Sequence, residues 1–313
     1  MKKWLIGLIS LLFLFSIGTY FFIPKKISIT RTVYANANQA GLFRFLSEEK
    51  NWERWWPGKA SDQEKDSVLE FGGYKFKLDN IRYNALTIII QANQQLDTSI
   101  IHMMPIGPDS SKIVWNALFN TGNNPFLKIN QYLKAKKLRN GLDMILDTLQ
   151  SFISNNKNIY GLDIKKEQVE IEYVVSTKKI FSKYPETEAI YEMINSIKKY
   201  ISQSHGMEEG YPMVNITSQD SAGYLAQVGV PVDREIPQKD QFFLKRLLKN
   251  GNILVAEMKG GRNASDSAMK KMELFAGDHK LFNIALPFLS LITDRTKEKD
   301  SSKWVTKIYY PVN

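Results

Sequence analysis

The stretch NILVAEMKGG, residues 252–261, decides how the second half of this chain is expected to fold. Within it Ile253, Val255 and Glu257 alternate with their neighbours, which is the two-residue period of a β-strand. Two glycines follow, and glycine permits positive φ and lets a helix begin close to a sheet. The stretch therefore predicts a strand, a tight turn and a helix, and we place that helix at 265–276.

The order strand, helix, strand, strand occurs twice between residues 160 and 313, after a polar hinge at 154–158. The predicted elements are 168–181, 186–202, 213–218 and 223–230 in the first copy, and 252–259, 265–276, 288–294 and 304–311 in the second. Each copy exposes one apolar sheet face. Two copies can bury those faces by pairing around a pseudo-twofold axis, which leaves a cleft at the seam.

This half of the chain resembles the GyrI-like family, the effector-binding module of AraC- and MerR-type regulators. Three segments carry the resemblance by their order and separation: VAEMKGG (255–261), LPFLSLITDR (286–295) and KWVTKIYYPV (303–312). The resemblance implies that a small amphipathic or cationic molecule binds between the two copies. In the family this is done with aromatic rings and a buried acid, and some relatives hydrolyse substrates with that acid.

The chain departs from the family pattern at its acidic positions. Leu289 stands where many relatives carry a glutamate, Leu291 stands at the following tyrosine position, and Lys307 replaces another commonly acidic residue. A desolvated carboxylate is what would stabilise a buried cation or act as a general base, so its loss argues against both roles. Glu257 is the remaining candidate acid, and the alternative is that it is an ordinary glutamate on an edge strand.

We expect the cleft to be lined by a set of aromatic side chains and this one acid: Tyr173, Tyr224, Glu257, Trp304 and Tyr309.

Residues 27–154 form the preceding predicted domain. The segment ISITRTVYA (27–35) alternates like a strand, and NWERWWPG (51–58) follows a short helical segment. Five strand-like runs without intervening helices then predict an antiparallel meander, and apolar residues at helical spacing from Ile129 to Ile153 predict a long closing helix. This order resembles the START-like superfamily, also called SRPBCC, which includes polyketide cyclases and has a helix-grip antiparallel sheet.

The START-like resemblance implies an apolar cavity between the sheet and the closing helix. The candidate lining residues are aromatic: Trp55, Trp56, Phe71, Phe76 and Trp115. The alternative is that each of these rings is simply part of the core.

Residues 1–26 are interpreted as a transmembrane anchor. Residues 4–23 contain no charge, are flanked by two lysines on each side, and as a helix would span about 30 Å, one hydrocarbon core. A cleaved signal peptide is the rival interpretation, but the apolar run is long and ends in FFIPKK. A two-residue N-terminal flank most simply stays in the cytoplasm, which places the rest of the chain in the periplasm of a bacterial cell.

Composition narrows the remaining classes of function. The 42 Lys and Arg against 32 Asp and Glu give a net charge of +10, but the cations are scattered and accompany no nucleic-acid motif, so we expect no nucleic-acid partner. The chain has no cysteine, and its three histidines lack metal-ligand spacing. We find no phosphate-binding loop, dinucleotide fingerprint or nucleophile motif, and we expect no cofactor and no metal.

The sequence thus predicts an α+β protein with three parts: an anchor at 1–26, a START-like domain at 27–154 and a GyrI-like domain at 160–313. The leading hypothesis is membrane-tethered, non-catalytic binding of a hydrophobic or amphipathic small molecule, for sensing or sequestration. Two alternatives stay open: a hydrolase or cyclase with Glu257 as general base, and a structural interaction protein of the envelope.

Overall fold

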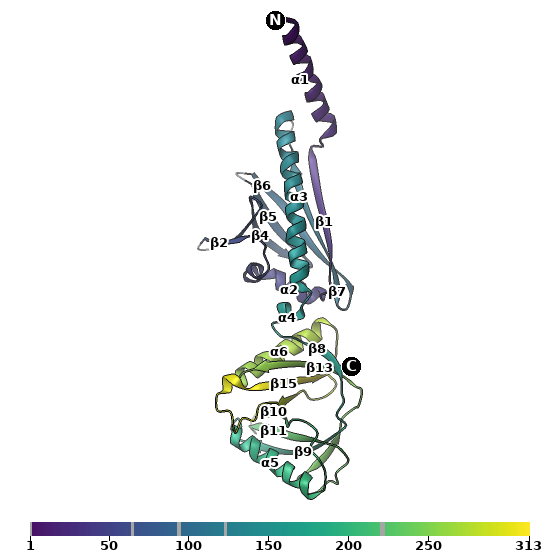
Figure 1. The fold of residues 1–313 in the computed structure, drawn as a ribbon, viewed down its shortest axis with the longest axis vertical. Helices are drawn as coiled ribbons and strands as arrows, with labels where there is room; N and C mark the ends of the chain where they lie inside the picture. The colour runs from purple at the N-terminus through teal and green to yellow at the C-terminus, as the bar shows by residue number, and fades with distance from the viewer. Residues whose placement is uncertain (1, 64–65, 93–94, 122–123, 220–222) are drawn as a thin grey trace. The chain divides into compact units, whose positions relative to one another are not determined.

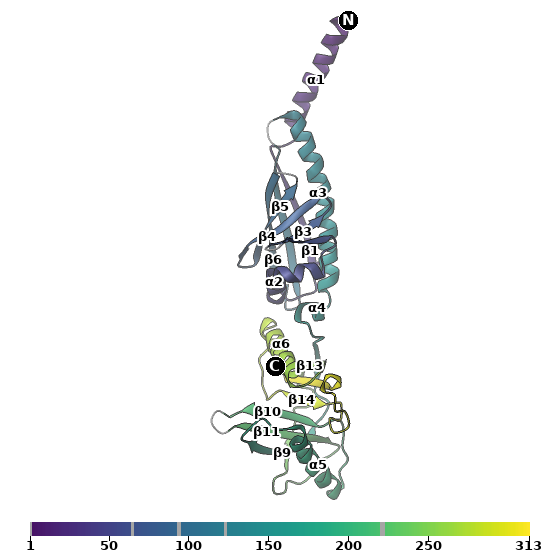
Figure 2. The same ribbon diagram turned by 90° about the vertical axis from the view of Figure 1, so that its left-hand side faces the viewer.

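The computed structural model describes residues 2–63, 66–92, 95–121, 124–219 and 223–313. It divides into two compact units, Met1–Asn155 and Asn156–Asn313, so the division falls inside the polar segment at 154–158. Each unit is built on its own antiparallel sheet, which makes the protein an α+β protein. Figures 1 and 2 show the fold of each unit from two directions.

The N-terminal unit contains one seven-stranded sheet in the order β1-β7-β6-β5-β4-β3-β2. Six of the strands follow one another in sequence as a meander, and β1 closes the sheet by pairing with β7 over ten residue pairs. The elements are α1 (Lys2–Phe22), β1 (Lys26–Ala35), α2 (Gln39–Ser47), η1 (Glu49–Arg54), β2 (Lys59–Gln63), β3 (Asp66–Phe71), β4 (Tyr74–Arg82), β5 (Ala85–Ala92), β6 (Gln95–Gly107), β7 (Ser110–Asn120) and α3 (Pro125–Ile153). The five predicted strands and the closing helix are confirmed, and β2 is an additional strand that the sequence analysis missed.

The long helix α3 packs along the sheet of this unit (Figures 1 and 2). Its start is set by Asn124, whose side chain accepts hydrogen bonds from the amides of Phe126 and Leu127, with Pro125 at the first helical position. Leu138, Leu142 and other apolar residues at three- and four-residue spacing are fully buried. The helix therefore closes the core of the sheet, as the apolar period predicted.

Helix α1 covers most of the charge-free N-terminal run. Lys128 of α3, only 1% exposed, donates to the backbone carbonyls of Tyr20 (3.4 Å) and Ile23 (2.9 Å) and lies over the Tyr20 ring. A cation at this position offsets the negative end of the helix dipole. In the part of the chain that the structure describes, no helix meets the length and apolarity needed to cross a bilayer.

The C-terminal unit contains an eight-stranded sheet in the order β12-β9-β11-β10-β14-β15-β13-β8. Its elements are α4 (Asn156–Tyr160), β8 (Lys165–Gln168), β9 (Tyr173–Phe181), α5 (Thr187–Gln203), β10 (Met213–Ser218), β11 (Tyr224–Val232), β12 (Phe243–Arg246), β13 (Asn252–Lys259), α6 (Arg262–Asp278), β14 (Phe288–Leu291), η3 (Ser301–Lys303) and β15 (Val305–Pro311). The expected strand at 168–181 is wrong in detail, because it is two short strands, β8 and β9, that pair with different neighbours. Strand β14 ends at Leu291 instead of 294, and β12 was not predicted.

Counted from either edge of this sheet, corresponding strands of the two copies follow in the same order. The order β9-β11-β10 in the first copy mirrors β13-β15-β14 in the second, and β10 pairs with β14 at the centre. The outer strands are exchanged: β8, which precedes the first copy, pairs with β13, and β12, which precedes the second copy, pairs with β9. Each copy thus completes the edge of the other.

Both helices of the C-terminal unit cover the same face of its sheet (Figure 1). Helix α5 packs with residues of β9, β10 and β11, and α6 packs with residues of β13 and β15. Leu289 of the central strand β14 touches both clusters. The helices are therefore anchored on the two outer thirds of the sheet, and the central strands lie between them.

Candidate ligand-binding site

A cleft lies on the helix-covered face of the C-terminal sheet, where the two copies meet. It consists of two adjoining cavities of about 250 and 390 Å³ that share much of their lining. Val214 and Ile216 of β10 and Leu289 of β14 form a common apolar floor. The start of α6 and the segment before α5 supply the walls, so both copies contribute to one site.

One wall is an aromatic and cationic stack. The guanidinium carbon of Arg262, at the start of α6, lies 3.5 Å from the centre of the Tyr184 ring, and Tyr184 meets Tyr224 edge-on with 5.5 Å between ring centres. Asp266, one turn along α6, lies 3.6 Å from Arg262. Burial raises the pKa of the Tyr184 hydroxyl, so this ring stays neutral and presents an apolar face with a polar edge.

Arg262 reaches Tyr184 because of the turn before its helix. Gly260 has a φ of +126°, as the glycine pair predicted, and a Cβ there would come within 2.7 Å of the Ala264 Cβ. Gly261 then caps the helix in an extended conformation. The turn therefore brings the N-terminal end of α6 close to the sheet edge at which the cleft opens.

The other wall is formed by Arg295 and Trp304. The Arg295 guanidinium lies over the Trp304 ring at 4.6 Å, and its Nη2 donates to the Thr306 hydroxyl at 2.9 Å. In the part of the chain that the structure describes, its buried Nε has no hydrogen-bond partner. Burial lowers the pKa of the Arg295 side chain, and the neighbouring groups that act against this are the phenols of Tyr191 and Tyr184, which carry no charge at neutral pH. Among the described residues, no carboxylate neutralises this partly buried cation.

The loop between β14 and β15 holds Arg295 and Trp304 in place. Asp294 accepts hydrogen bonds from the amide and hydroxyl of Thr296, and Asp300 accepts the same pair from Ser302. These bonds hold the pKa of each carboxyl below its usual value. The Trp304 indole in turn donates to the Glu298 carbonyl at 2.8 Å, so the loop orients both cleft residues.

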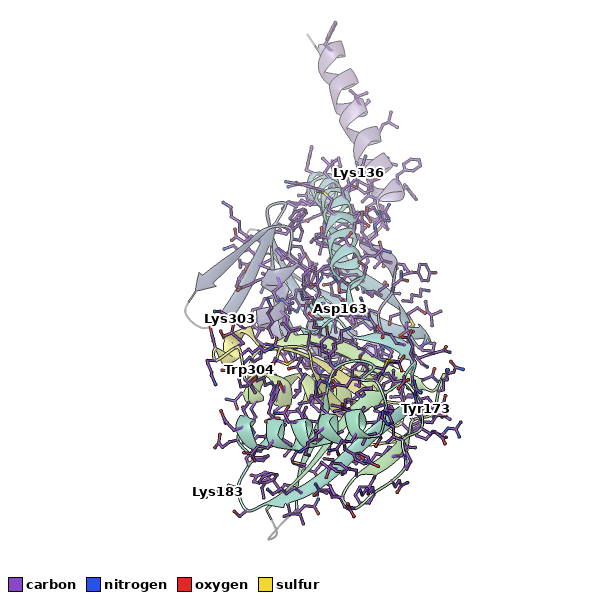
Figure 3. All side chains as sticks on the ribbon, turned by 60° about the horizontal axis from the view of Figure 1, so that its bottom comes forward. Lys136, Asp163, Tyr173, Lys183, Lys303 and Trp304 are labelled. Carbon is purple, nitrogen blue, oxygen red and sulfur yellow. The ribbon has the colours of Figure 1, made fainter. Side chains whose placement is uncertain are left out.

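The structure brings only two of the five expected cleft residues together. Tyr224 and Trp304 line the cleft. Tyr309 lies on the opposite face of the sheet, where its ring stacks on Phe288 at 4.9 Å. Tyr173 lies on β9, the second strand from the edge, beneath Arg246 of β12, and Figure 3 shows it well apart from Trp304 within this unit.

Glu257 also lies outside the cleft. Its neighbours Ala256 and Met258 belong to the α6 core, so alternation directs Glu257 to the face without helices. It is exposed, sits opposite Lys307 in the β13–β15 ladder, and borders another cavity, of about 350 Å³, together with Lys271. This position matches the edge-strand interpretation and lacks the desolvation that a general base or a cation-binding acid needs.

The three expected tryptophans of the N-terminal unit pack against one another or against core rings. Trp55 and Trp56 have ring centres 5.5 Å apart, Trp56 lies 5.1 Å from Phe76, and Phe76 lies 6.0 Å from Trp115. All four are buried, and Trp115 is fully inaccessible. The rings fill the space between them, which favours the core interpretation for these four residues.

Sequence reasoning missed most of the charged and hydroxyl groups of the cleft: Tyr184, Tyr191, Arg262, Asp266 and Arg295. Arg295 ends the segment LPFLSLITDR, which was quoted for the GyrI-like resemblance without a role for Arg295. Tyr184 stands in the polar turn before α5 and belongs to no periodic pattern. Only the pairing of β10 with β14 brings these loops together, and no local sequence signal predicts that pairing.

Comparison with family models and with curated proteins finds no match. Solved structures show distant likeness. The chain is similar to the EcmrR C-terminal domain (13% identity, 49% of this chain and 98% of that chain, TM-score 0.41) and to a START superfamily protein from Mycobacterium smegmatis (13%, 39% and 98%, TM-score 0.27). It is also similar to the di-domain ARO/CYC BexL (8%, 92% and 85%, TM-score 0.35). At such identities and scores, the function proposed below rests on the geometry of this chain.

The chemistry available in the cleft is recognition by shape, stacking and positive charge. Apolar side chains form the floor, flat rings and guanidinium groups form the walls, and Arg295 offers hydrogen-bond donors in a partly desolvated place. Within the described residues, no group of three or more His, Asp or Glu side chains is arranged to hold a metal ion.

Proposed function

We propose that this protein binds a small amphipathic molecule in the cleft between α5 and α6, without transforming it. The ligand would have a flat apolar body and an anionic group. The apolar floor and the Tyr184 ring would accept the body, and Arg295 would accept the anion. Apolar burial would supply most of the affinity, at about 25 cal/mol per Å² before the costs of association.

The state of Arg295 is the observation that carries this proposal. A partly buried guanidinium without a carboxylate partner is costly, and an anionic ligand would repay that cost by a charge-assisted hydrogen bond. Burial shields the interaction from solvent and makes it stronger than at the surface. The positive charge of Arg295 is thus left without a counter-charge in the cleft, and a ligand that neutralises it must be an anion.

The uncompensated charge of Arg295 also argues against a cationic ligand. The carboxylates that border the cleft, Glu186, Asp266 and Glu273, are exposed, and Asp266 is already beside Arg262. Leu289 lies on the floor where the GyrI-like resemblance would place a glutamate. A cation entering here would meet two arginines and no buried acid.

A matched pair of probes tests the proposal. We expect 2-naphthoate to bind the full chain in titration calorimetry and 2-naphthylmethylammonium, which has the same ring system and the opposite charge, to bind at least tenfold more weakly. The difference follows from one charge-assisted hydrogen bond of about 1.5–3 kcal/mol. Equal binding of the two probes, or stronger binding of the cation, would contradict it.

Substitutions locate the site. Arg295→Gln should weaken naphthoate binding about ten- to hundredfold, whereas Lys299→Gln, which removes one charge from an exposed position of the same loop, should leave it unchanged. Trp304 is the one tryptophan in the sequence of the C-terminal unit. Trp304→Phe keeps an aromatic ring at the wall of the cleft and removes this indole. The fluorescence change on naphthoate binding should therefore disappear in this variant while the binding itself persists.

We further propose, on the charge-free run at 4–23 alone, that this binding unit is tethered to a membrane and faces the periplasm. Fractionation of cells that express the full chain or residues 27–313 tests this. The full chain should sediment with membranes and resist alkaline extraction, and the shorter chain should not. A full chain that stays in the soluble fraction would end the proposal of an anchor and leave the cleft unaffected.

A further inference from the structure

A second cavity, of about 270 Å³, lies on the face of the C-terminal sheet that carries no helix. Met213 and Gly229 form part of its floor, and Leu286 and Phe288 form the wall on the side of β14. Most of its lining residues are apolar, and Leu286 is 55% exposed. This cavity lies across the sheet from the cleft, because residues that alternate along a strand point to opposite faces, and Val214, Asn215 and Pro287 border both.

One end of the cavity is positively charged. Lys245 of β12 lines it and donates to the Gln227 side chain at 2.8 Å, and Lys178 of β9 is the cross-strand partner of Gln227. Partial burial and the nearby Lys178 lower the pKa of the Lys245 ammonium, which shows that the two cations act on each other. In the described part of the chain, neither ammonium forms an ion pair with a carboxylate.

Beside the lysines the floor is polar. Asn215 is the cross-strand partner of Gln227 on β10, and its amide nitrogen donates to the Pro287 carbonyl at 2.7 Å. The cavity therefore has a polar, cationic end across β9, β11 and β10 and an apolar body toward the segment before β14. This is the distribution that an alkyl chain with a negative head group would match.

We propose that this second cavity is a binding site for a medium-chain alkyl carboxylate, with the chain in the apolar body and the carboxylate between Lys245 and Lys178. A water molecule in the liquid takes up about 30 Å³, and we use the same volume for one methylene or carboxylate group of the ligand. The cavity of about 270 Å³ therefore holds about nine such groups. The site is independent of the cleft, since it lies on the other face of the sheet and uses none of Tyr184, Arg262 or Arg295.

Three probes of equal chain length test the assignment on the full chain: decanoate, decanol and decylammonium, each below its aggregation concentration. In titration calorimetry decanoate should bind at least tenfold more tightly than decanol, because only the carboxylate makes charge-assisted hydrogen bonds. Decylammonium should bind most weakly of the three. An order in which decanol or decylammonium equals decanoate would show an apolar pocket only, and the assignment would be wrong.

Variants separate the two ends of the site. The double substitution Lys178→Gln, Lys245→Gln should weaken decanoate at least tenfold and leave decanol unchanged, whereas Lys183→Gln, Lys239→Gln, which removes two exposed charges elsewhere in the unit, should change neither. Ala285→Trp, at the exposed mouth, should block decanoate and decanol alike.

The changed lysines and the changed alanine are exposed, so these variants should keep the melting temperature of the parent chain, which a thermal scan verifies. Decanoate binding that survives both the double lysine change and Ala285→Trp would overturn the assignment. Arg295→Gln should leave decanoate binding unchanged. The lysine variants thus test this site and Arg295→Gln tests the cleft, so either proposal can be contradicted without the other.

Discussion

Three neighbouring tryptophans of the N-terminal unit differ in one atom's surroundings. The Trp52 indole donates to the Leu46 carbonyl at 2.7 Å and the Trp56 indole to the Glu70 carbonyl at 3.3 Å, but the buried Trp55 Nε1 has no partner among the residues that the structure describes. A buried donor without a partner costs the free energy of desolvation and gains no bond. The three rings therefore bury similar apolar area, but their indole N–H groups contribute unequally to the free energy of unfolding.

Replacing each indole with phenylalanine should expose this difference. Trp52→Phe should destabilise the fold by at least about 1 kcal/mol more than Trp55→Phe, because the first change breaks a buried hydrogen bond and the second removes an unsatisfied donor. Both variants lose similar ring volume, so each is the other's control. Urea denaturation followed by near-ultraviolet circular dichroism measures the comparison, and an equal loss in both variants would refute the assigned difference.

The two aspartates of the β14–β15 loop predict an acid dependence of the cleft. Because their pKa values are lower in the folded protein, their bonds stabilise the fold fully above the unfolded-state pKa of about 3.9 and lose this effect as pH falls through the folded values. The variant Asp294→Asn, Asp300→Asn should thus bind naphthoate more weakly than the parent chain at neutral pH. At a pH below both folded values, where these carboxyls are protonated, the difference in melting temperature should vanish, and a difference that persists there would contradict this role.

The helix α6 is the element whose placement decides whether Arg262 reaches the cleft. Two residues before its start Gly260 occupies a φ of +126° with the Ala264 Cβ close by, whereas a Cβ at Gly277, near its end, would meet no described atom within 4 Å. Substitution by alanine should therefore have opposite effects at Gly260, in the turn before the helix, and at Gly277, within it.

Gly260→Ala should destabilise the protein by about 1–3 kcal/mol, since it forces a side chain into a conformation that favours glycine and into contact with Ala264. Gly277→Ala should stabilise it by up to about 1 kcal/mol, because alanine loses less backbone entropy in a helix and meets open space. Thermal denaturation of both variants provides the measurement. A stabilising Gly260→Ala would show that the turn before α6 is not constrained as described.

At the scale of the whole molecule, local sequence period predicted the elements far better than it predicted the site. Alternation in NILVAEMKGG correctly grouped Ile253, Val255 and Glu257 on one face, and the predicted bounds of β10 and β13 agree with the structure. Alternation does not say which face the helices cover, however. Glu257 and Tyr309 belong to the face without helices, and so they do not join Tyr224 and Trp304.

Long-range pairing accounts for the rest of what the sequence could not predict. The exchange of β8 and β12 between the copies, and the contact of β10 with β14 that creates the cleft, depend on strands far apart in the chain. Arg295 and Tyr184 lie in loops with no periodic signal, and they meet only because those strands pair. Both faces of the sheet then carry a cavity, one ending at two arginines and one at two lysines, in a chain of net charge +10.

The measurement that most directly tests the cleft is a map of amide and indole chemical shifts during titration of the full chain with 2-naphthoate. We expect the largest changes at Tyr184, Arg262, Arg295 and the Trp304 indole, which line the cleft from both copies, and none at Glu257 on the other face. Changes absent from these four residues, or centred on Glu257, would contradict the proposal that the seam of the duplicated unit is the ligand site.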